Sequence, residues 1–480
     1  MKEANLTLAR SAYSGISWTA FSTLSKGILQ LAQLIIVARF LAPLELGVLA
    51  LLNIVVGFAQ IFGEAGISNA VIYHNSLNKT QLNQLYLINI LFGGVVSVFF
   101  FLLSYPLAAF FAIEQWESLF MYLAPIFLIR SFSQQPLALL QQRLAFDRIA
   151  KIEVFAAVMA FITLLILLYY NFRLTAVVIA QLLNALVLTL AVFMLDSSVR
   201  PRLTKIKWQS IAEPIRYGLY QSGERLVNYL GTQFDQLVIG KLLGAETLGI
   251  YAYIKALVFR PALQLINPIV NKVSFPLMVK YRDSHSMSDI YAQIIRLLSL
   301  INVPLYLLMA SYPDTILSIT FGHDWQIHAD LMRWLALYML LLSFINPVGV
   351  LLKASGEVKR SFWWNIAVTV IRPLVIILGI SHGMVFFIKM LVYTQVFLFF
   401  LHWYYLIKPI IPLTLIQLLL KIFIPCAAFG FASIITLFGI NNLWELTDFY
   451  KFILSAIIYV LLILPFLGRI IKPRFNGKQL

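Results

Sequence analysis

A series of long apolar segments, separated by short polar connections, limits what this 480-residue chain can fold into more than any other feature. A helix that crosses a bilayer needs roughly 20 consecutive, mostly apolar residues. The segments that approach or exceed this length are 12–38, 45–71, 82–111, 118–142, 150–170, 174–195, 214–240, 246–275, 288–320, 330–352, 360–381, 384–407, 412–439 and 447–468. Inside a membrane, backbone polar groups must be paired within helices or closed barrels. We therefore predict an all-α polytopic membrane protein with about fourteen transmembrane helices.

The composition excludes the other broad classes of protein. Hydrophobic residues make up 61% of the chain and charged residues 12%, against about 45–50% and about 25% in soluble domains. The connections are too short to hold a catalytic domain, so we expect no enzyme activity and no cofactor. A net charge of +16 indicates nucleic-acid binding only where a soluble domain exposes a basic face. Because the basic residues here lie between apolar segments, we expect no nucleic-acid partner.

Lysine and arginine are distributed unequally between alternate connections. The basic set includes residues 2–10, 143–151, 200–207, 353–360 and 469–478, whereas the opposite set holds little beyond Arg39, Arg173, Lys241 and Lys451. Cytoplasmic connections of membrane proteins carry an excess of Lys and Arg. Both termini are therefore predicted to lie in the cytoplasm.

An internal repeat indicates how the segments are grouped. Residues 38–50 match residues 240–252, which lie 202 positions later, and the interval contains six segments. An even number of spans keeps both copies in the same orientation, so the repeat is parallel. We therefore predict an N-terminal six-helix lobe (1–195), a basic linker (196–213), a C-terminal six-helix lobe (214–407), and two extra helices with a basic tail (408–480).

Polar side chains form single-face stripes on two segments related by the repeat. A spacing of three or four residues places side chains on one face of a helix. The stripe in 214–240 consists of Gln221, Glu224, Arg225, Asn228, Thr232 and Asp235. The stripe in 12–38 consists of Thr19, Ser22, Thr23, Lys26, Gln30 and Gln33. Since the repeat preserves a polar face, this pair of stripes is the strongest functional signal in the sequence.

Further polar residues interrupt other apolar segments. They are Asn53, Gly57, Gln60 and Glu64 in 45–71; Arg130, Gln134 and Gln141 in 118–142; Lys255, Arg260, Gln264 and Asn267 in 246–275; and Arg372 in 360–381. A charge at the bilayer centre costs about 2.5–3.5 kcal/mol on insertion scales, so it usually faces a cavity or a partner helix. For the uncharged members, lining a cavity and hydrogen bonding between helices remain equal alternatives. For Glu64 and Asp235, helix capping is an alternative to a role in coupling.

The basic excess among these residues favours an anionic ligand. We predict Lys26, Arg225, Lys255 and Arg260, together with Arg130 and Arg372, as cavity cations. Arginine can bind phosphate oxygens through two parallel hydrogen bonds, and neighbouring Asn, Gln and Tyr side chains suit hydroxyl-rich ligands. A sugar linked through phosphate fits both features. We expect no metal site, because His323, Asp324, His328 and Asp330 are more typical of a solvated loop.

Three stretches carry a resemblance to a known family: 37–51, 62–72 and 217–255. The chain resembles the polysaccharide-transport branch of the multidrug/oligosaccharidyl-lipid/polysaccharide exporter superfamily. The resemblance implies a V-shaped bundle with a cationic lumen that alternates between inward-open and outward-open states. The implied substrate is an undecaprenyl-pyrophosphate-linked oligosaccharide, flipped across the bacterial inner membrane for lipopolysaccharide or exopolysaccharide synthesis. Membrane lipids and polysaccharide assembly proteins are the other implied partners.

Two alternatives to this flippase function remain. One is a multidrug-type or other lipid-precursor exporter of the same superfamily, although the basic excess disfavours cationic drugs. The other is a membrane polysaccharide polymerase, which would need a long extracytoplasmic loop for its catalytic residues.

Overall fold

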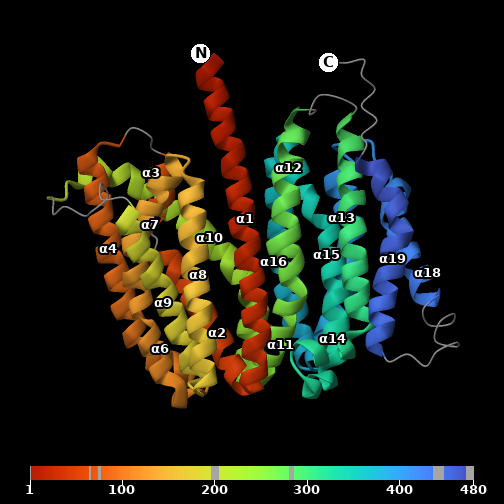
Figure 1. Ribbon diagram of the computed structural model, residues 1–480, viewed down its shortest axis with the longest axis horizontal. Coiled ribbons are helices and arrows are strands. Elements are labelled where there is room, and N and C mark those ends of the chain that lie inside the picture. Colours follow the sequence, from red (N-terminus) through yellow and green to blue (C-terminus); the bar gives the residue numbers. More distant parts are fainter. Residues whose placement is uncertain are drawn as a thin grey trace. The chain divides into compact units, whose positions relative to one another are not determined.

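The computed structural model describes residues 2–63, 66–73, 77–195, 205–280, 286–435 and 448–471. Every regular element in these ranges is a helix (Figure 1). The chain divides into two compact units, Met1–Tyr253 and Ile254–Leu480. The boundary falls within one helix, α11, and therefore later in the chain than the predicted linker at 196–213.

The first unit contains ten α-helices, one short 3₁₀ turn and the first part of α11 within the described residues. Their bounds are α1 Lys2–Phe40, α2 Pro43–Gly63, α3 Ile67–Tyr73, α4 Lys79–Leu102, α5 Ser104–Phe110, η1 Glu114–Trp116, α6 Glu117–Leu123, α7 Pro125–Gln142, α8 Phe146–Tyr169, α9 Arg173–Leu195, α10 Trp208–Leu242 and α11 Gly244–Arg260.

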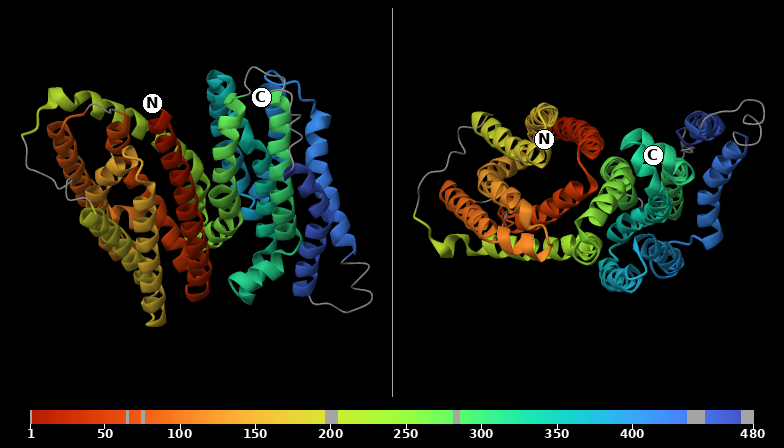
Figure 2. Two further views of the ribbon diagram at one scale, coloured as in Figure 1. Left: turned by 45° about the horizontal axis from the view of Figure 1, so that its top comes forward. Right: turned by 90° about the horizontal axis from the view of Figure 1, so that it is seen from below.

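The second unit begins in α11 and continues to the C-terminus. Its further elements are η3 Pro261–Ile266, α12 Asn267–Lys280, α13 Ser286–Ser311, α14 Pro313–Thr320, η4 His323–His328, α15 Ala329–Ser355, α16 Val358–Ile380, α17 Met384–His402, η5 Trp403–Ile407, α18 Leu415–Ile434 and α19 Asp448–Ile471. Helices α18 and α19 pack against α13 and can be followed in both views of Figure 2. The Tyr459 hydroxyl of α19 donates to the Leu300 carbonyl of α13 at 3.1 Å.

By length and composition, ten helical stretches among the described residues are suited to crossing a membrane. This confirms an all-α polytopic membrane protein. Helix α10 covers the predicted segment 214–240 but is not among the ten. Its polar stripe lowers its mean hydropathy, although it is 35 residues long.

Helix α4 shows how the sequence separates a lipid-facing surface from an interior. A capping box starts the helix, with Asn78 and Gln81 each accepting from the other's backbone N–H. Every third or fourth residue on one face is apolar and at least 60% exposed: Leu91, Val95, Val98 and Leu102. On the buried side, the Asn89 amide donates to the Ser131 carbonyl of α7 at 2.8 Å. Apolar groups outside and hydrogen-bonded polar groups inside are the arrangement expected of a helix in lipid.

The two copies of the sequence repeat adopt the same local structure. Helix α1 ends at Phe40 and α2 begins at Pro43, while α10 ends at Leu242 and α11 begins at Gly244. The copies also touch within the first unit. A Cβ atom added to Gly47 would clash with the Ala245 carbonyl, and one added to Gly249 would clash with the Pro43 carbonyl. Since the two contacts exchange equivalent positions of the repeat, α2 and α11 meet through a reciprocal glycine contact.

A salt bridge fixes the beginning of α2. Glu45 is 9% exposed, and one of its oxygens accepts from the Ala42 backbone N–H at 2.9 Å. Arg173, the first residue of α9, donates to both carboxylate oxygens, at 2.7 and 2.6 Å. The carboxylate therefore caps one helix while it attaches a second.

Candidate functional site

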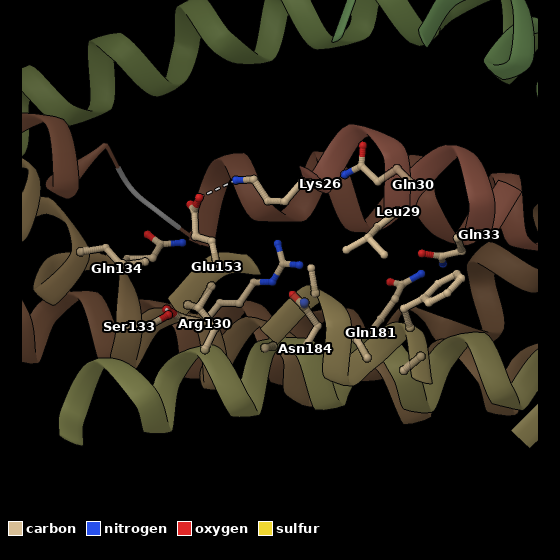
Figure 3. Close-up of a pocket in the computed structure, with 17 residues that line it drawn as sticks. Lys26, Leu29, Gln30, Gln33, Arg130, Ser133, Gln134, Glu153, Gln181 and Asn184 are labelled. Atoms are coloured by element: carbon tan, nitrogen blue, oxygen red, sulfur yellow. Dashed lines mark hydrogen bonds and ion pairs between the residues drawn. The ribbon is translucent and has the colours of Figure 1, made fainter. Parts of the chain in front are cut away.

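A polar cavity of about 530 Å³ lies within the first unit. Four helices line it, α1, α7, α8 and α9 (Figure 3). Its polar lining consists of Lys26, Gln30 and Gln33 from α1; Arg130, Ser133 and Gln134 from α7; Glu153 from α8; and Gln181 and Asn184 from α9.

An ion pair joins α1 to α8 at the cavity wall. The Lys26 Nζ lies 2.5 Å from the Glu153 Oε2, and the Ser22 hydroxyl donates to the same oxygen at 2.9 Å. The Lys26 and Glu153 side chains are 33% and 27% exposed. Mutual attraction and the Ser22 hydrogen bond offset part of the cost of removing both charges from water. Lys26 is therefore a paired cation.

Arg130 supplies the second positive charge. Figure 3 shows its guanidinium between Glu153 and Asn184. With Lys26 and Arg130 positive and Glu153 negative, the formal charge of the lining is +1. Most of the polar side chains that line the cavity are therefore uncharged, and its net charge is small.

Amide side chains dominate the remaining polar lining. The Gln181 Nε2 donates to the Asn53 Oδ1 of α2 at 3.1 Å. The Gln134 Oε1 is buried and has no hydrogen-bond partner among the described residues. A buried acceptor without a partner costs about 1–3 kcal/mol. Gln134 therefore brings to the lining an acceptor that the described residues leave unpaired.

Sequence reasoning found part of this cavity and missed part of it. Lys26, Gln30 and Gln33 were named on segment 12–38, and Arg130 and Gln134 on segment 118–142; the structure brings both sets to one site. Glu153 and the pair Gln181 and Asn184 were not predicted. The two amides lie three positions apart in an otherwise apolar helix, which is a signal that could have identified them.

The predicted residues of α10 lie outside this cavity lining. Glu224, Arg225 and Asn228 are exposed, and the Gln221 Oε1 is buried with no partner in the described part of the chain. Asp235 accepts from the Tyr251 hydroxyl at 2.5 Å, which ties α10 to the middle of α11. Glu64 lies outside the described residues.

The other predicted residues lie in the second unit. Lys255 lies on α11 with its Nζ 5.6 Å from the Phe259 ring centroid, and Arg260 is the last residue of that helix. The π-helical turn η3 follows and carries Gln264, and α12 begins at Asn267. Both amide oxygens are buried and unpartnered among the residues described. Such π-helical turns are frequent at functional sites.

Arg372 lies on α16 of the second unit. Its Nη2 donates to the Gln395 Oε1 of α17 at 3.4 Å. Its Nε is buried and makes no hydrogen bond within the described ranges. Arg372 therefore contacts a neighbouring helix through one end of its guanidinium.

Comparison with known proteins identifies the family. Residues 36–330, more than half of the chain, match the family model described as polysaccharide biosynthesis protein. The teichuronic acid biosynthesis protein TuaB of Bacillus subtilis is 29% identical over 389 residues, which cover 78% of each chain. The lipopolysaccharide biosynthesis protein WzxC of Escherichia coli is 27% identical over 425 residues, covering 88% of this chain and 86% of WzxC.

A solved structure shares the fold. The lipid II flippase MurJ in an inward closed conformation superposes with a TM-score of 0.75 at 14% sequence identity, covering 95% of this chain and all of MurJ. At this identity the likeness concerns the fold. The family match shows that the chain belongs to the polysaccharide biosynthesis protein family and is a transport protein, not an enzyme, and the shared fold is that of a multi-pass membrane protein.

Proposed function

We propose that this protein flips an undecaprenyl-pyrophosphate-linked oligosaccharide from the cytoplasmic to the periplasmic leaflet of a bacterial inner membrane by alternating access. The observation that carries the proposal is the polar cavity between α1, α7, α8 and α9. Its volume, about 530 Å³, is within the range of sites that hold small molecules. A hydrophilic cargo needs such a cavity, because lipid offers no hydrogen-bond partners.

The number of polar groups supports cargo binding over helix packing alone. Polar side chains in membrane proteins can hydrogen-bond across helices, and the Lys26–Glu153 and Gln181–Asn53 contacts are of that kind. The cavity is also lined by the amides Gln33 and Asn184. Intramembrane polar and ionisable residues commonly mark a substrate pathway.

The names of similar proteins support the choice of cargo. TuaB is described by its part in teichuronic acid biosynthesis, WzxC by its part in lipopolysaccharide biosynthesis, and MurJ as a lipid II flippase. A transport protein of such pathways handles sugar-containing precursors. We therefore infer a lipid-linked saccharide over a drug-like cation.

The finer architecture belongs to the same proposal. We propose about fourteen spans in two parallel-repeat lobes, 1–195 and 214–407, joined by the linker 196–213 and followed by 408–480. Both termini are proposed to be cytoplasmic. The proposed substrate-binding cations are Lys26, Arg130, Arg225, Lys255, Arg260 and Arg372, with Lys255 and Arg260 as the pair for the first mutational test.

Deletion of the gene tests the proposal in the cell. Lipid-linked repeat units should accumulate and should be accessible only from the cytoplasmic face of membrane vesicles. Unchanged levels of these units would contradict the proposed cargo. In complementation, the double variant Lys255→Ala/Arg260→Ala should insert normally but fail to restore polymer export, whereas the control Lys353→Ala, at the end of α15, should restore it.

A further inference from the structure

We propose that the cavity of the first unit is a saccharide subsite, which binds hydroxylated sugar rings of the cargo and not its pyrophosphate. This inference rests on the proposed function and names the part of the cargo that the cavity holds. The observations behind it are the kind of polar groups in the lining, their charge balance and the apolar side chains beside them.

The lining is rich in groups that both donate and accept hydrogen bonds. Five amide side chains face the cavity: Gln30, Gln33, Gln134, Gln181 and Asn184. Each amide carries an NH₂ donor and a carbonyl acceptor side by side. A sugar hydroxyl also donates and accepts, so a ring with several hydroxyls can use both ends of each amide. An ionised phosphate offers acceptors only, so it can use the NH₂ end of each amide but not the carbonyl end.

The charge balance also disfavours pyrophosphate. Lys26 already contacts the Glu153 carboxylate at 2.5 Å, so a phosphate that approached Lys26 would come beside a fixed negative charge. The lining as a whole has a formal charge of +1, whereas pyrophosphate carries more than one negative charge. A neutral sugar, or one with a single carboxylate, matches this balance better.

The apolar part of the lining includes small side chains and one aromatic ring. Alanine lines the cavity at Ala157 and Ala160 of α8 and at Ala180 and Ala185 of α9, and α8 also contributes Phe161. Sugar rings have C–H faces as well as hydroxyl edges. A lining that combines amides with small apolar side chains and an aromatic ring suits both surfaces.

Gln134 gives the sharpest test residue. Its Oε1 is buried without a hydrogen-bond partner among the described residues, and it lines the cavity from α7. The adjacent Gln135 provides a matched control, because its Oε1 is likewise buried without a partner among the described residues but Gln135 is not part of the lining; its Nε2 donates to the Leu82 carbonyl at 2.8 Å. Gln134 and Gln135 can each be changed to Met, which keeps the length of the side chain and removes its amide.

The experiment measures binding of two lipids to the full-length protein in nanodiscs. The first probe is the undecaprenyl-pyrophosphate-linked repeat unit extracted from the deletion strain, and the second is undecaprenyl pyrophosphate without sugar. Gln134→Met, and Asn184→Leu on a different helix, should each weaken binding of the first probe about tenfold, the loss of roughly two hydrogen bonds. Binding of the second probe should be unchanged, and Gln135→Met should alter neither.

The outcomes separate the subsite from the proposed function. If wild-type protein binds neither lipid, the proposed function fails and the subsite with it. If wild-type protein binds both lipids but the cavity variants weaken both equally, or leave the first probe unaffected, only the subsite is overturned. Selective loss of binding of the saccharide-bearing lipid in both cavity variants supports the proposal. If one variant expresses too poorly to assay, the other variant decides the outcome.

Discussion

The reciprocal contact between α2 and α11 predicts a specific stability defect when either glycine gains a side chain. A Cβ atom on Gly47 would lie 2.5 Å from the Ala245 carbonyl carbon, and one on Gly249 would lie 2.6 Å from the Gly47 backbone nitrogen. The crowded atoms are backbone atoms, so relief requires α2 and α11 to separate. Overpacking of this kind typically costs 1–3 kcal/mol. We expect Gly47→Ala and Gly249→Ala each to destabilise the protein by about 2 kcal/mol.

A control and a double variant make this prediction specific. Gly223 lies inside α10 with no atom within 4 Å of an added Cβ, so Gly223→Ala should stabilise the protein by about 0.5–1 kcal/mol through helix propensity. In Gly47→Ala/Gly249→Ala, one separation of the helices relieves both clashes. The double variant should therefore be more stable than the sum of the single effects predicts, by about 1 kcal/mol.

The assay is an unfolding titration with SDS in detergent micelles, which gives the free energy of unfolding of each variant. The reasoning would be refuted if Gly47→Ala were as stable as Gly223→Ala. Strict additivity of the two substitutions would refute the shared contact, because independent sites add to within about 0.5 kcal/mol.

Two ion pairs give further predictions. Lys26→Met should reduce stability and export more than Lys26→Met/Glu153→Met does, because the single variant leaves a carboxylate without its cation. Unfolding free energy and polymer export are measured for both variants. Equal losses in the single and the double variant would contradict the pairing. Glu45→Ala should cost about 1–2 kcal/mol, since it removes both a helix cap and the contact with Arg173. Arg173→Ala should also destabilise the protein, because it leaves the buried Glu45 carboxylate without its cation although the cap stays in place; an unfolding free energy of Arg173→Ala equal to that of the wild type would contradict this.

The fold class could be predicted from the sequence because lipid imposes a simple rule on helices. Apolar segments of sufficient length were visible without any tertiary information, and ten of the described helices satisfy that rule. Helix α10 was identified by its polar stripe at helical spacing and by the repeat, since its mean hydropathy is low. The contact between Gly47 and Ala245 could not be predicted, because a repeat indicates equal local structure and does not indicate that its copies touch.

The candidate site was only partly predictable for a related reason. A lysine inside an apolar segment is conspicuous, so Lys26 was identified. Glu153 lies near the beginning of its segment, two residues after Lys151, and resembles a residue of the connecting loop. Its role appears only when α8 packs against α1 and brings the two charges within 2.5 Å. Pairing across helices depends on packing angles and offsets, which a single sequence does not specify.

The most direct test of the proposed transport is a flipping assay with purified protein. Lipid-linked repeat units from the deletion strain are placed in both leaflets of sealed vesicles, and a membrane-impermeant oxidant of sugar diols is added outside. Without protein, about half of the saccharide should react, and with wild-type protein all of it should react. A reactive fraction that stays near one half with correctly inserted wild-type protein would contradict the account.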